Sequence, residues 1–500
     1  MLIFKKMKMK KKNRIIKSLA VFSFLIGFTS SCSDNFIDRK PVYSQDSENY
    51  FNSKDDYNNA LIGAYQLLQS TFMNVLVGEI ASDNTLSGGE SANDVVGIQQ
   101  IDNMIQTGNN GNLKNIWDWM FAGVYRASYI IEFKDKIDFD GKNQIIAEAR
   151  FLRAYYQFEL VKWFGGIPLK GDKRFLLGDE KTIPRSSISE SYAAIEADLN
   201  YAVANLNSIA PQTGRATKGA AQALLGKVYL YQNKYTSAAT TLQNVINSGT
   251  YSLVTNYNSI FEEAGENNAE SVFEVQYTDI QGAGFDCLQC SQGNVAVGYN
   301  GVRNYTGPFF SDGFSFNVPT QNAVDAFEVG DNRKNVAILN IQTWATANNA
   351  TYGTGYKNTG YFNRKYIPRT RSGLAQGDLH LTNPNNYRSI RYADVLLMAA
   401  EANSKIGADV NARLYLNQVR QRAFGDNNHN ITASGAALTD FILTERRVEL
   451  LGEGHRFFDL VRTGKAAIII GFAAGKNELF PIPIEEIQFS NGNWQQNPGY

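Results

Sequence analysis

The stretch ERRVELLGEGHRFFDLVRTG, residues 445–464, gathers residue types that could perform acid–base chemistry. Glu445, Glu449 and Glu453 recur every four residues, so on a helix they would lie along one face. A glycosidase needs two carboxylates that face each other across a sugar, about 5–10 Å apart. Three acids along one face of a helix have no second carboxylate opposite them. With arginines beside them, they are typical of bidentate ion pairs, and we interpret the stretch as structural bracing.

Other catalytic patterns are missing from the chain. It has no H-E-x-x-H, G-x-S-x-G or G-x-x-x-x-G-K-[ST] motif. His380 and His429 stand in polar stretches that are typical of solvated surface. Cys287 and Cys290 cannot form a four-ligand zinc site without histidines, so the sequence favours a local disulfide between them over a redox site. We therefore expect no catalytic residues, no metal and no cofactor.

Aromatic residues in a segment rich in Gly, Asn and Thr indicate a binding role instead. Rings can stack on the flat C–H faces of sugars, while Asn, Asp, Arg and Gln bind the hydroxyl groups. No helical periodicity explains these aromatic residues as core, and they are expected to lie in loops. The candidates for ligand contact are Tyr299, Tyr305, Trp344, Tyr352 and Tyr356. The loop 82–95 contains no aromatic residue, so Asp83 and Asn84 are expected to fix that loop.

The N-terminus has the pattern of an export signal. Residues 1–31 hold eight basic residues and no acid, and SLAVFSFLIGFT is too short to cross a bilayer. Small residues then lead to Cys32, as in a bacterial lipoprotein signal, although Thr29 departs from the usual Leu. The alternative is an ordinary secretory signal with an incidental cysteine. No later apolar stretch is expected to span a membrane.

The mature chain is acidic and its elements are predicted to be mostly helical. Without the eight basic residues of the signal, 40 basic residues stand against 48 acidic ones, which argues against a nucleic-acid surface. Residues 218–249 and 391–423 each read as a pair of helices in which small residues alternate with large ones, as in tetratricopeptide repeats. Between about 271 and 387 this periodicity fades, and short strands such as SVFEVQY are expected.

Six segments, spread in order over the mature chain, resemble the SusD/RagB family. They are SCSDNFIDRKP (31–41), ARFLRAYYQFELVKWFGGIPL (149–169), RATKGAAQALLGKVYLY (215–231), RYADVLLMAAEA (391–402), ILTERRVELLGEGHRFFDLVR (442–462) and FPIPIEEIQFSNGNWQQNPGY (480–500). The resemblance implies a mostly α fold, with tetratricopeptide-type helix pairs on one side and a looser, loop-rich half with a few short strands carrying the ligand site.

The same resemblance implies a surface-exposed outer-membrane lipoprotein, lipidated at Cys32, that binds glycan and passes it to a SusC-like TonB-dependent transporter. Peptide binding, a surface glycoside hydrolase and a pure scaffold are the alternatives. The predicted parts are the signal peptide (1–31), a tether (32–50), an N-terminal helical part (51–270), a loop-rich ligand-binding part (271–387) and the signature region (388–500).

Overall fold

Helices make up most of the computed structural model, which describes residues 50–282, 284–370 and 376–500. The predicted lipidation site, Cys32, lies outside these residues. Residues 53–500 form one compact unit, and the rest of the chain up to Asn52 forms another. The finer division of the larger unit into three parts stays a prediction.

The first half of the larger unit contains most of the long helices, together with a few short ones. They are α3 (Lys54–Gln66), η1 (Leu67–Thr71), α4 (Phe72–Ile80), α5 (Val96–Asp102), α6 (Gly111–Glu132), α7 (Lys142–Phe164), η2 (Asp179–Lys181), α8 (Ile188–Asn205), α9 (Lys218–Tyr231) and α10 (Tyr235–Asn247). The helix α7 is almost entirely buried and ends at Gly165, whose φ of +75° suits glycine. Gly166 and Pro168 follow, and neither favours continuation of the helix.

Short helices dominate the middle of the chain, and long ones return near its end. These are η3 (Tyr257–Phe261), η4 (Glu263–Gly265), η5 (Phe285–Cys290), α11 (Val295–Asn300), α12 (Gln321–Asp325), α13 (Lys334–Ala337), α14 (Ile341–Asn348), α15 (Tyr392–Lys405), α16 (Asp409–Phe424), α17 (Gly435–Glu449), α18 (Arg456–Arg462), η6 (Ala466–Ile468) and α19 (Ile484–Phe489).

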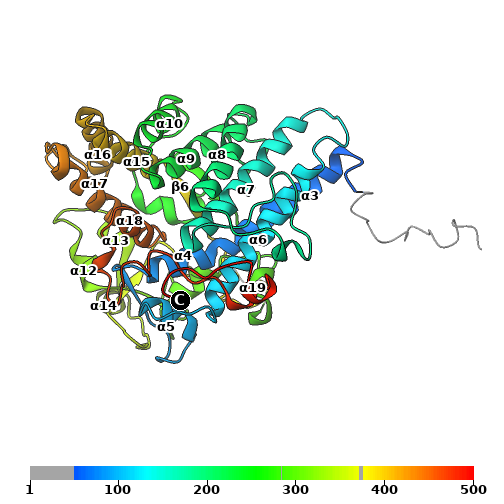
Figure 1. Ribbon diagram of the computed structural model, residues 1–500. Helices are drawn as coiled ribbons and strands as arrows, with labels where there is room; N and C mark the ends of the chain where they lie inside the picture. Colours follow the sequence, from blue (N-terminus) through cyan, green and yellow to red (C-terminus); the bar gives the residue numbers. More distant parts are fainter. Residues whose placement is uncertain (1–49, 283, 371–375) are drawn as a thin grey trace, which may run out of the picture. The chain divides into compact units, whose positions relative to one another are not determined.

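The long helices pack against their neighbours in chain order. Helices α6 to α10 form successive contacts, α10 packs on α15, and α15 packs on α16 and α17 (Figure 1). Both predicted helix pairs are confirmed, as α9 with α10 and α15 with α16. A Cβ on Gly226 of α9 would lie 2.5 Å from Leu242 Cγ of α10, so the small residue sets how closely this pair packs.

The strands are short and pair only in twos. β1 (Thr85–Ser87) pairs with β3 (Asn317–Pro319), β2 (Ser271–Val275) with β6 (Tyr387–Arg391), and β4 (Ile338–Asn340) with β5 (Tyr361–Asn363), all antiparallel. The strand predicted from SVFEVQY is thus confirmed as β2. The mostly α fold with a loop-rich part is also confirmed.

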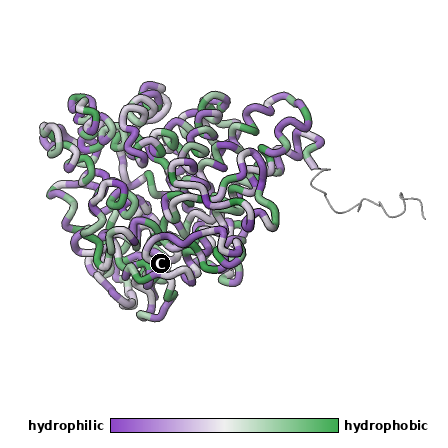
Figure 2. The backbone as a smooth tube through the Cα atoms, in the orientation of Figure 1, coloured by the Kyte–Doolittle hydropathy of each residue, from purple (hydrophilic) through white to green (hydrophobic). Residues whose placement is uncertain are grey.

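One stretch after the signal is apolar and long enough to cross a membrane, contrary to expectation. It covers Lys54–Ile80, but it folds as α3, η1 and α4, and 61% of its most apolar window is buried within the fold. Such burial is typical of core helices. Figure 2 shows hydrophobic and hydrophilic stretches alternating along the helical elements, as expected for helices with one face packed inward.

Candidate functional site

Three glutamates of the 445–464 stretch lie inside the protein against basic side chains from distant parts of the chain. Their side chains are at most 2% exposed. The buried charge ladder is the name used below for Glu445, Glu449, Glu453, Arg333, Lys365 and Arg391. Every carboxylate in it is bound by at least one cation, which confirms the interpretation as bracing.

The two arginines of the ladder each bridge two carboxylates. Arg333 Nη1 lies 2.6 Å from Glu445 Oε1 and 2.9 Å from Glu449 Oε2. Arg391 Nη1 lies 2.8 Å from Glu449 Oε1, and its Nη2 lies 2.8 Å from Glu453 Oε1. Because the guanidinium groups alternate with the carboxylates, charges of one sign are separated by charges of the other.

The ladder joins the helical part of the fold to the loop-rich part. Arg333 and Lys365 come from the segment 271–387, and Lys365 Nζ donates to Glu453 Oε1 at 2.7 Å. Burial alone would raise the pKa of Glu449, but the surrounding guanidinium groups outweigh it and hold that pKa well below its usual range. The charged glutamates therefore fix the loop-rich part in place.

The helix that enters the 445–464 stretch ends before Glu453, whereas the four-residue spacing predicts that all three glutamates lie on one helix. Helix α17 stops at Glu449, and Glu453 lies in the turn that follows. Gly452 and Gly454 there have φ values of +83° and +80°, and a Cβ on Gly454 would lie 2.9 Å from Val75 Cα. Backbone conformation and close packing both require glycine, and this turn brings Glu453 back to the ladder.

The loop 82–95 is fixed by the same region of the chain. Asp83 Oδ1 accepts a hydrogen bond from Arg456 Nε at 2.7 Å. Arg447 Nε donates to Asn84 Oδ1 at 2.8 Å. The predicted role of Asp83 and Asn84 in holding this loop is thereby confirmed.

The five candidate aromatic residues differ in exposure and in local structure. Tyr299 lies on α11 and Trp344 on α14, so the expectation that they lie in loops is wrong for these two. Tyr299 and Tyr305 are 5% and 6% exposed, so both belong to the core although no helical periodicity indicates it. Trp344, Tyr352 and Tyr356 are half-buried. Contacts with distant segments bury Tyr299 and Tyr305, and periodicity along one segment cannot reveal such contacts.

Two rings form a partly exposed aromatic surface that we call the aromatic platform: the exposed Phe309 and the half-buried Trp344. Their centroids are 5.8 Å apart, with an interplanar angle of 73°, and Phe309 is 66% exposed. Phe310 lies beneath, 4.8 Å from Trp344, and Tyr352 packs against the same buried cluster. The platform therefore stands on a packed base.

Phe309 reaches the surface because its backbone is held in an unusual conformation. Its φ is +70°, and the Phe310 amide donates to the Pro308 carbonyl at 2.9 Å, which closes a three-residue turn around Phe309. A positive φ at an aromatic residue costs on the order of 1–3 kcal/mol and clusters at ligand sites. Phe309 was not among the candidates predicted from the sequence. The two adjacent rings of GPFF were a usable signal, because the turn there buries Phe310 and leaves Phe309 exposed.

Trp344 is oriented by two neighbours. Its Nε1 donates to Tyr305 Oη at 2.9 Å, and Tyr305 donates in turn to the Pro308 carbonyl at 2.8 Å. The Arg364 guanidinium lies 5.9 Å from the Trp344 ring centroid, and its Nε is buried with no hydrogen-bond partner. Tyr305 is thus a positioning residue, and the Arg364 guanidinium packs near the Trp344 ring.

The other two candidates lie apart from the platform. The Tyr299 ring packs 5.2 Å from that of Phe316, and burial raises the pKa of Tyr299 to about 12. The Tyr356 amide donates to the Gly89 carbonyl at 2.9 Å, which ties Tyr356 to the loop 82–95. The structure therefore gathers three of the five candidates in one place and leaves two elsewhere.

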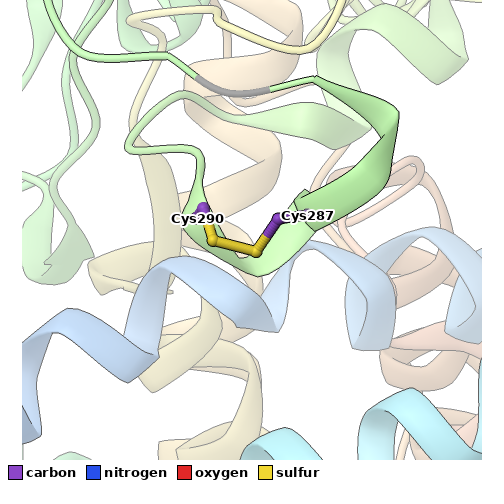
Figure 3. The surroundings of a disulfide bond; sticks show 2 residues. All are labelled: Cys287 and Cys290. Atoms are coloured by element: carbon purple, nitrogen blue, oxygen red, sulfur yellow. A yellow bond between two sulfur atoms is a disulfide. The ribbon is translucent and has the colours of Figure 1, made fainter.

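Cys287 and Cys290 are joined by a disulfide within η5 (Figure 3). Their Cα atoms are 5.3 Å apart. The short helix η5 packs against η1, so the bond closes a small turn on the surface of the helical part.

Comparisons with known proteins match this arrangement over nearly the whole chain. The model of the SusD family matches residues 337–468, and a second model, described as starch-binding and associating with the outer membrane, matches residues 35–230. A solved laminarin-binding SusD-like protein is 34% identical, with a TM-score of 0.81 over 90% of this chain and 100% of that one. The chain belongs to the SusD family.

Two further relatives of this SusD-family protein show the same coverage. A surface glycan-binding protein A from Bacteroides fluxus is 28% identical, with a TM-score of 0.80 over 90% of this chain and 100% of that chain. A SusD-like protein of Formosa agariphila is 28% identical over 98% of this chain and 99% of its own. The solved relatives are described as glycan-binding, and the second family description names association with the outer membrane.

Proposed function

We propose that this SusD-family protein binds glycan on the cell surface without transforming it and delivers it to a SusC-like TonB-dependent transporter. A lipid at Cys32 anchors it in the outer membrane, facing outward. Because each buried CH₂ contributes roughly 0.8 kcal/mol, two or more acyl chains would hold it stably. The aromatic platform is the observation that carries the glycan-binding part of this proposal.

The platform has the chemistry of a sugar-binding surface. Stacking one sugar ring on Trp344 buries roughly 50 Å² of apolar surface, about 1 kcal/mol at 25 cal/mol/Å². Gln342 and Thr343 are exposed on α14 beside Trp344, and their polar side chains can bind hydroxyl groups. Two rings with a few hydrogen bonds give affinities of about 4–8 kcal/mol, in the micromolar to millimolar range. Such weak binding suits a protein that must release its ligand.

Two observations support binding without catalysis. The carboxylates of the 445–464 stretch are buried in ion pairs. Glu262 forms an ion pair with Arg369, and the Arg369 guanidinium packs against the Phe310 ring beneath the platform. Burial would raise the pKa of Glu262, but the hydrogen bond from Arg369 outweighs it and lowers that pKa. A general acid for glycoside hydrolysis requires a raised pKa.

Native affinity gels containing laminarin, the glycan of the solved relative, test the proposal. The wild type is expected to migrate more slowly in the presence of laminarin, and Trp344→Ala and Phe309→Ala to lose about fivefold to tenfold in affinity each. Tyr125→Ala removes a ring that is 43% exposed outside the platform, and it should bind like wild type.

Three results would contradict the proposal. Release of new reducing ends from a bound glycan would establish a hydrolase. Full binding by both platform variants to a confirmed glycan would place the ligand site elsewhere. Retention of peptides but of no polysaccharide in parallel gels would favour a peptide-binding member of the family.

A further inference from the structure

A row of aromatic side chains runs along one face of α6, from the buried Trp117 to Phe133, the residue after the last turn. The rings recur every four residues, so neighbouring rings are about 6 Å apart along the helix axis. They are Trp117, Phe121, Tyr125, Tyr129 and Phe133. Arg174, from the loop after α7, covers the last two, since its guanidinium lies 4.3 Å from the Tyr129 ring centroid and 5.5 Å from that of Phe133. The first three rings lie outside this cover.

These three rings form the floor of a groove of about 490 Å³ between α6, the loop after α7 and α19. Its walls are apolar and unusually exposed: Leu176 is 53% exposed, Leu177 fully exposed and Phe489 61% exposed. Exposed large apolar side chains that surround one groove are typical of a surface that a partner covers.

Carboxylates are placed at the groove, without a basic residue among its lining side chains. Asp118, Glu180 and Glu486 line it. Lys114, outside the lining, lies 2.8 Å from Asp118 and 3.7 Å from Glu486 and so balances one of the three charges. Burial, followed by the charge of Asp118, raises the pKa of Glu486. The groove therefore has a net negative charge and favours a cationic partner.

The same features disfavour a sugar or a lipid as the occupant. A neutral glycan would leave the net charge of the carboxylates unmatched and would bring hydroxyl groups against the aliphatic side chains of Leu176 and Leu177. Each polar group buried without a partner costs about 1–3 kcal/mol. The Trp494 Nε1 donor is already bound to the Ile183 carbonyl at 2.8 Å. Anionic lipid headgroups would meet carboxylates instead of the Lys and Arg that bind them. A polypeptide with apolar and basic side chains satisfies both the walls and the charge.

We propose that this groove docks a polypeptide segment of the transporter partner, with a large apolar side chain between Tyr125 and Leu177 and a Lys or Arg at the carboxylates. The identity of the partner rests on the proposed function, whereas the chemistry of the segment follows from the groove. The groove is built from α6 and α19 and the aromatic platform from α14 and its neighbours, so each can be changed separately.

Purification of the lipidated full-length chain from native outer membranes, with its partners identified from their peptides, tests the inference. The wild type should recover a TonB-dependent transporter. Leu177→Asp should lower that recovery at least about tenfold, because it places a charge in the apolar wall beside carboxylates. Glu180→Lys should lower it about fivefold by reversing one attraction. Both variants should melt at the wild-type temperature and keep wild-type migration in laminarin gels.

A matched control is Val329→Asp, which introduces the same charge at a side chain that is 97% exposed elsewhere. It should leave transporter recovery and laminarin binding unchanged. Recovery of the transporter by Leu177→Asp at the wild-type level would overturn the groove as the docking site and leave the proposed function standing. A wild type that recovers no transporter would overturn both this inference and the delivery step of the proposed function.

Discussion

The buried charge ladder and the aromatic platform differ in where they place their side chains: the ladder buries charged groups, and the platform exposes aromatic ones. In the ladder, carboxylates and cations are buried together, and Glu449 alone contacts Arg333, Arg391 and Arg422. In the platform, rings that usually fill cores are left exposed. A residue type therefore indicates a function only after its partners are known.

The two regions also depend on each other. The ladder holds Arg333 and Lys365, which flank α14 in the chain, and α14 carries Trp344. Paired charges position that segment, and the segment presents the ring. The 445–464 stretch thus positions the segment that carries the aromatic platform.

Breaking the ladder should give the largest effect. Glu449→Gln removes the one negative charge that Arg333, Arg391 and Arg422 share, which leaves an excess of buried positive charge. We therefore expect the free energy of unfolding to fall by about 3–5 kcal/mol. Denaturant unfolding at neutral pH measures this change. Protein that remains folded at low temperature should still bind laminarin, because Glu449 does not contact the platform.

An exposed ion pair provides the control for this comparison. Lys465 and Asp440 form a salt bridge whose side chains are 47% and 66% exposed. Asp440→Asn should change stability by about 0.5 kcal/mol or less, because water solvates the remaining charge. A similar small change for Glu449→Gln would show that the ladder does not hold the fold.

Glu266 sharpens the comparison because it is a buried carboxylate without a close cation. Burial raises its pKa to about 7, and the Arg388 guanidinium is 3.9 Å away. A raised folded-state pKa means that stability is lost as pH rises from about 4.5 to about 7. Glu266→Gln removes that loss, so the variant should be about 1–2 kcal/mol more stable than wild type at pH 8 and no more stable at pH 4.5.

Glu262→Gln is the matched variant with the opposite sign. The pKa of Glu262 is lowered despite its burial because Arg369 binds it, so its contribution is present above the unfolded pKa and lost as pH falls. It should destabilise the protein at pH 8. Equal effects of the two substitutions across pH 4.5–8 in denaturant unfolding would contradict the assigned roles.

Much of the helical frame was predictable because its signals are local. The pairs α9 with α10 and α15 with α16 follow from small and large residues at helical spacing. The end of α7 follows from Gly165 and Gly166. The bracing role of the glutamates followed from their spacing and from the arginines beside them, although the partners Arg333 and Lys365, about a hundred residues away, could not be identified.

The platform was only partly predictable because it depends on contacts between distant segments. Trp344 was a candidate, but Phe309 was not, since its exposure results from a turn with positive φ. Tyr299 and Tyr305 look like exposed rings in a polar sequence, yet the fold buries both. Composition identified the segment that carries the platform, and tertiary contacts decided which of its rings are exposed.

Tyr305 lies beside the platform and orients Trp344. Its substitution should therefore give the smallest effect on affinity. Tyr305→Phe keeps the ring but removes the hydroxyl that accepts from Trp344 Nε1. The loss of one hydrogen bond that orients the ring should lower laminarin affinity about twofold to threefold, roughly 0.5 kcal/mol. If Tyr305 acts only through Trp344, the substitution should have no further effect in a Trp344→Ala background. Additive losses in that double-mutant cycle, measured in affinity gels, would show that Tyr305 contributes to binding by a route other than Trp344.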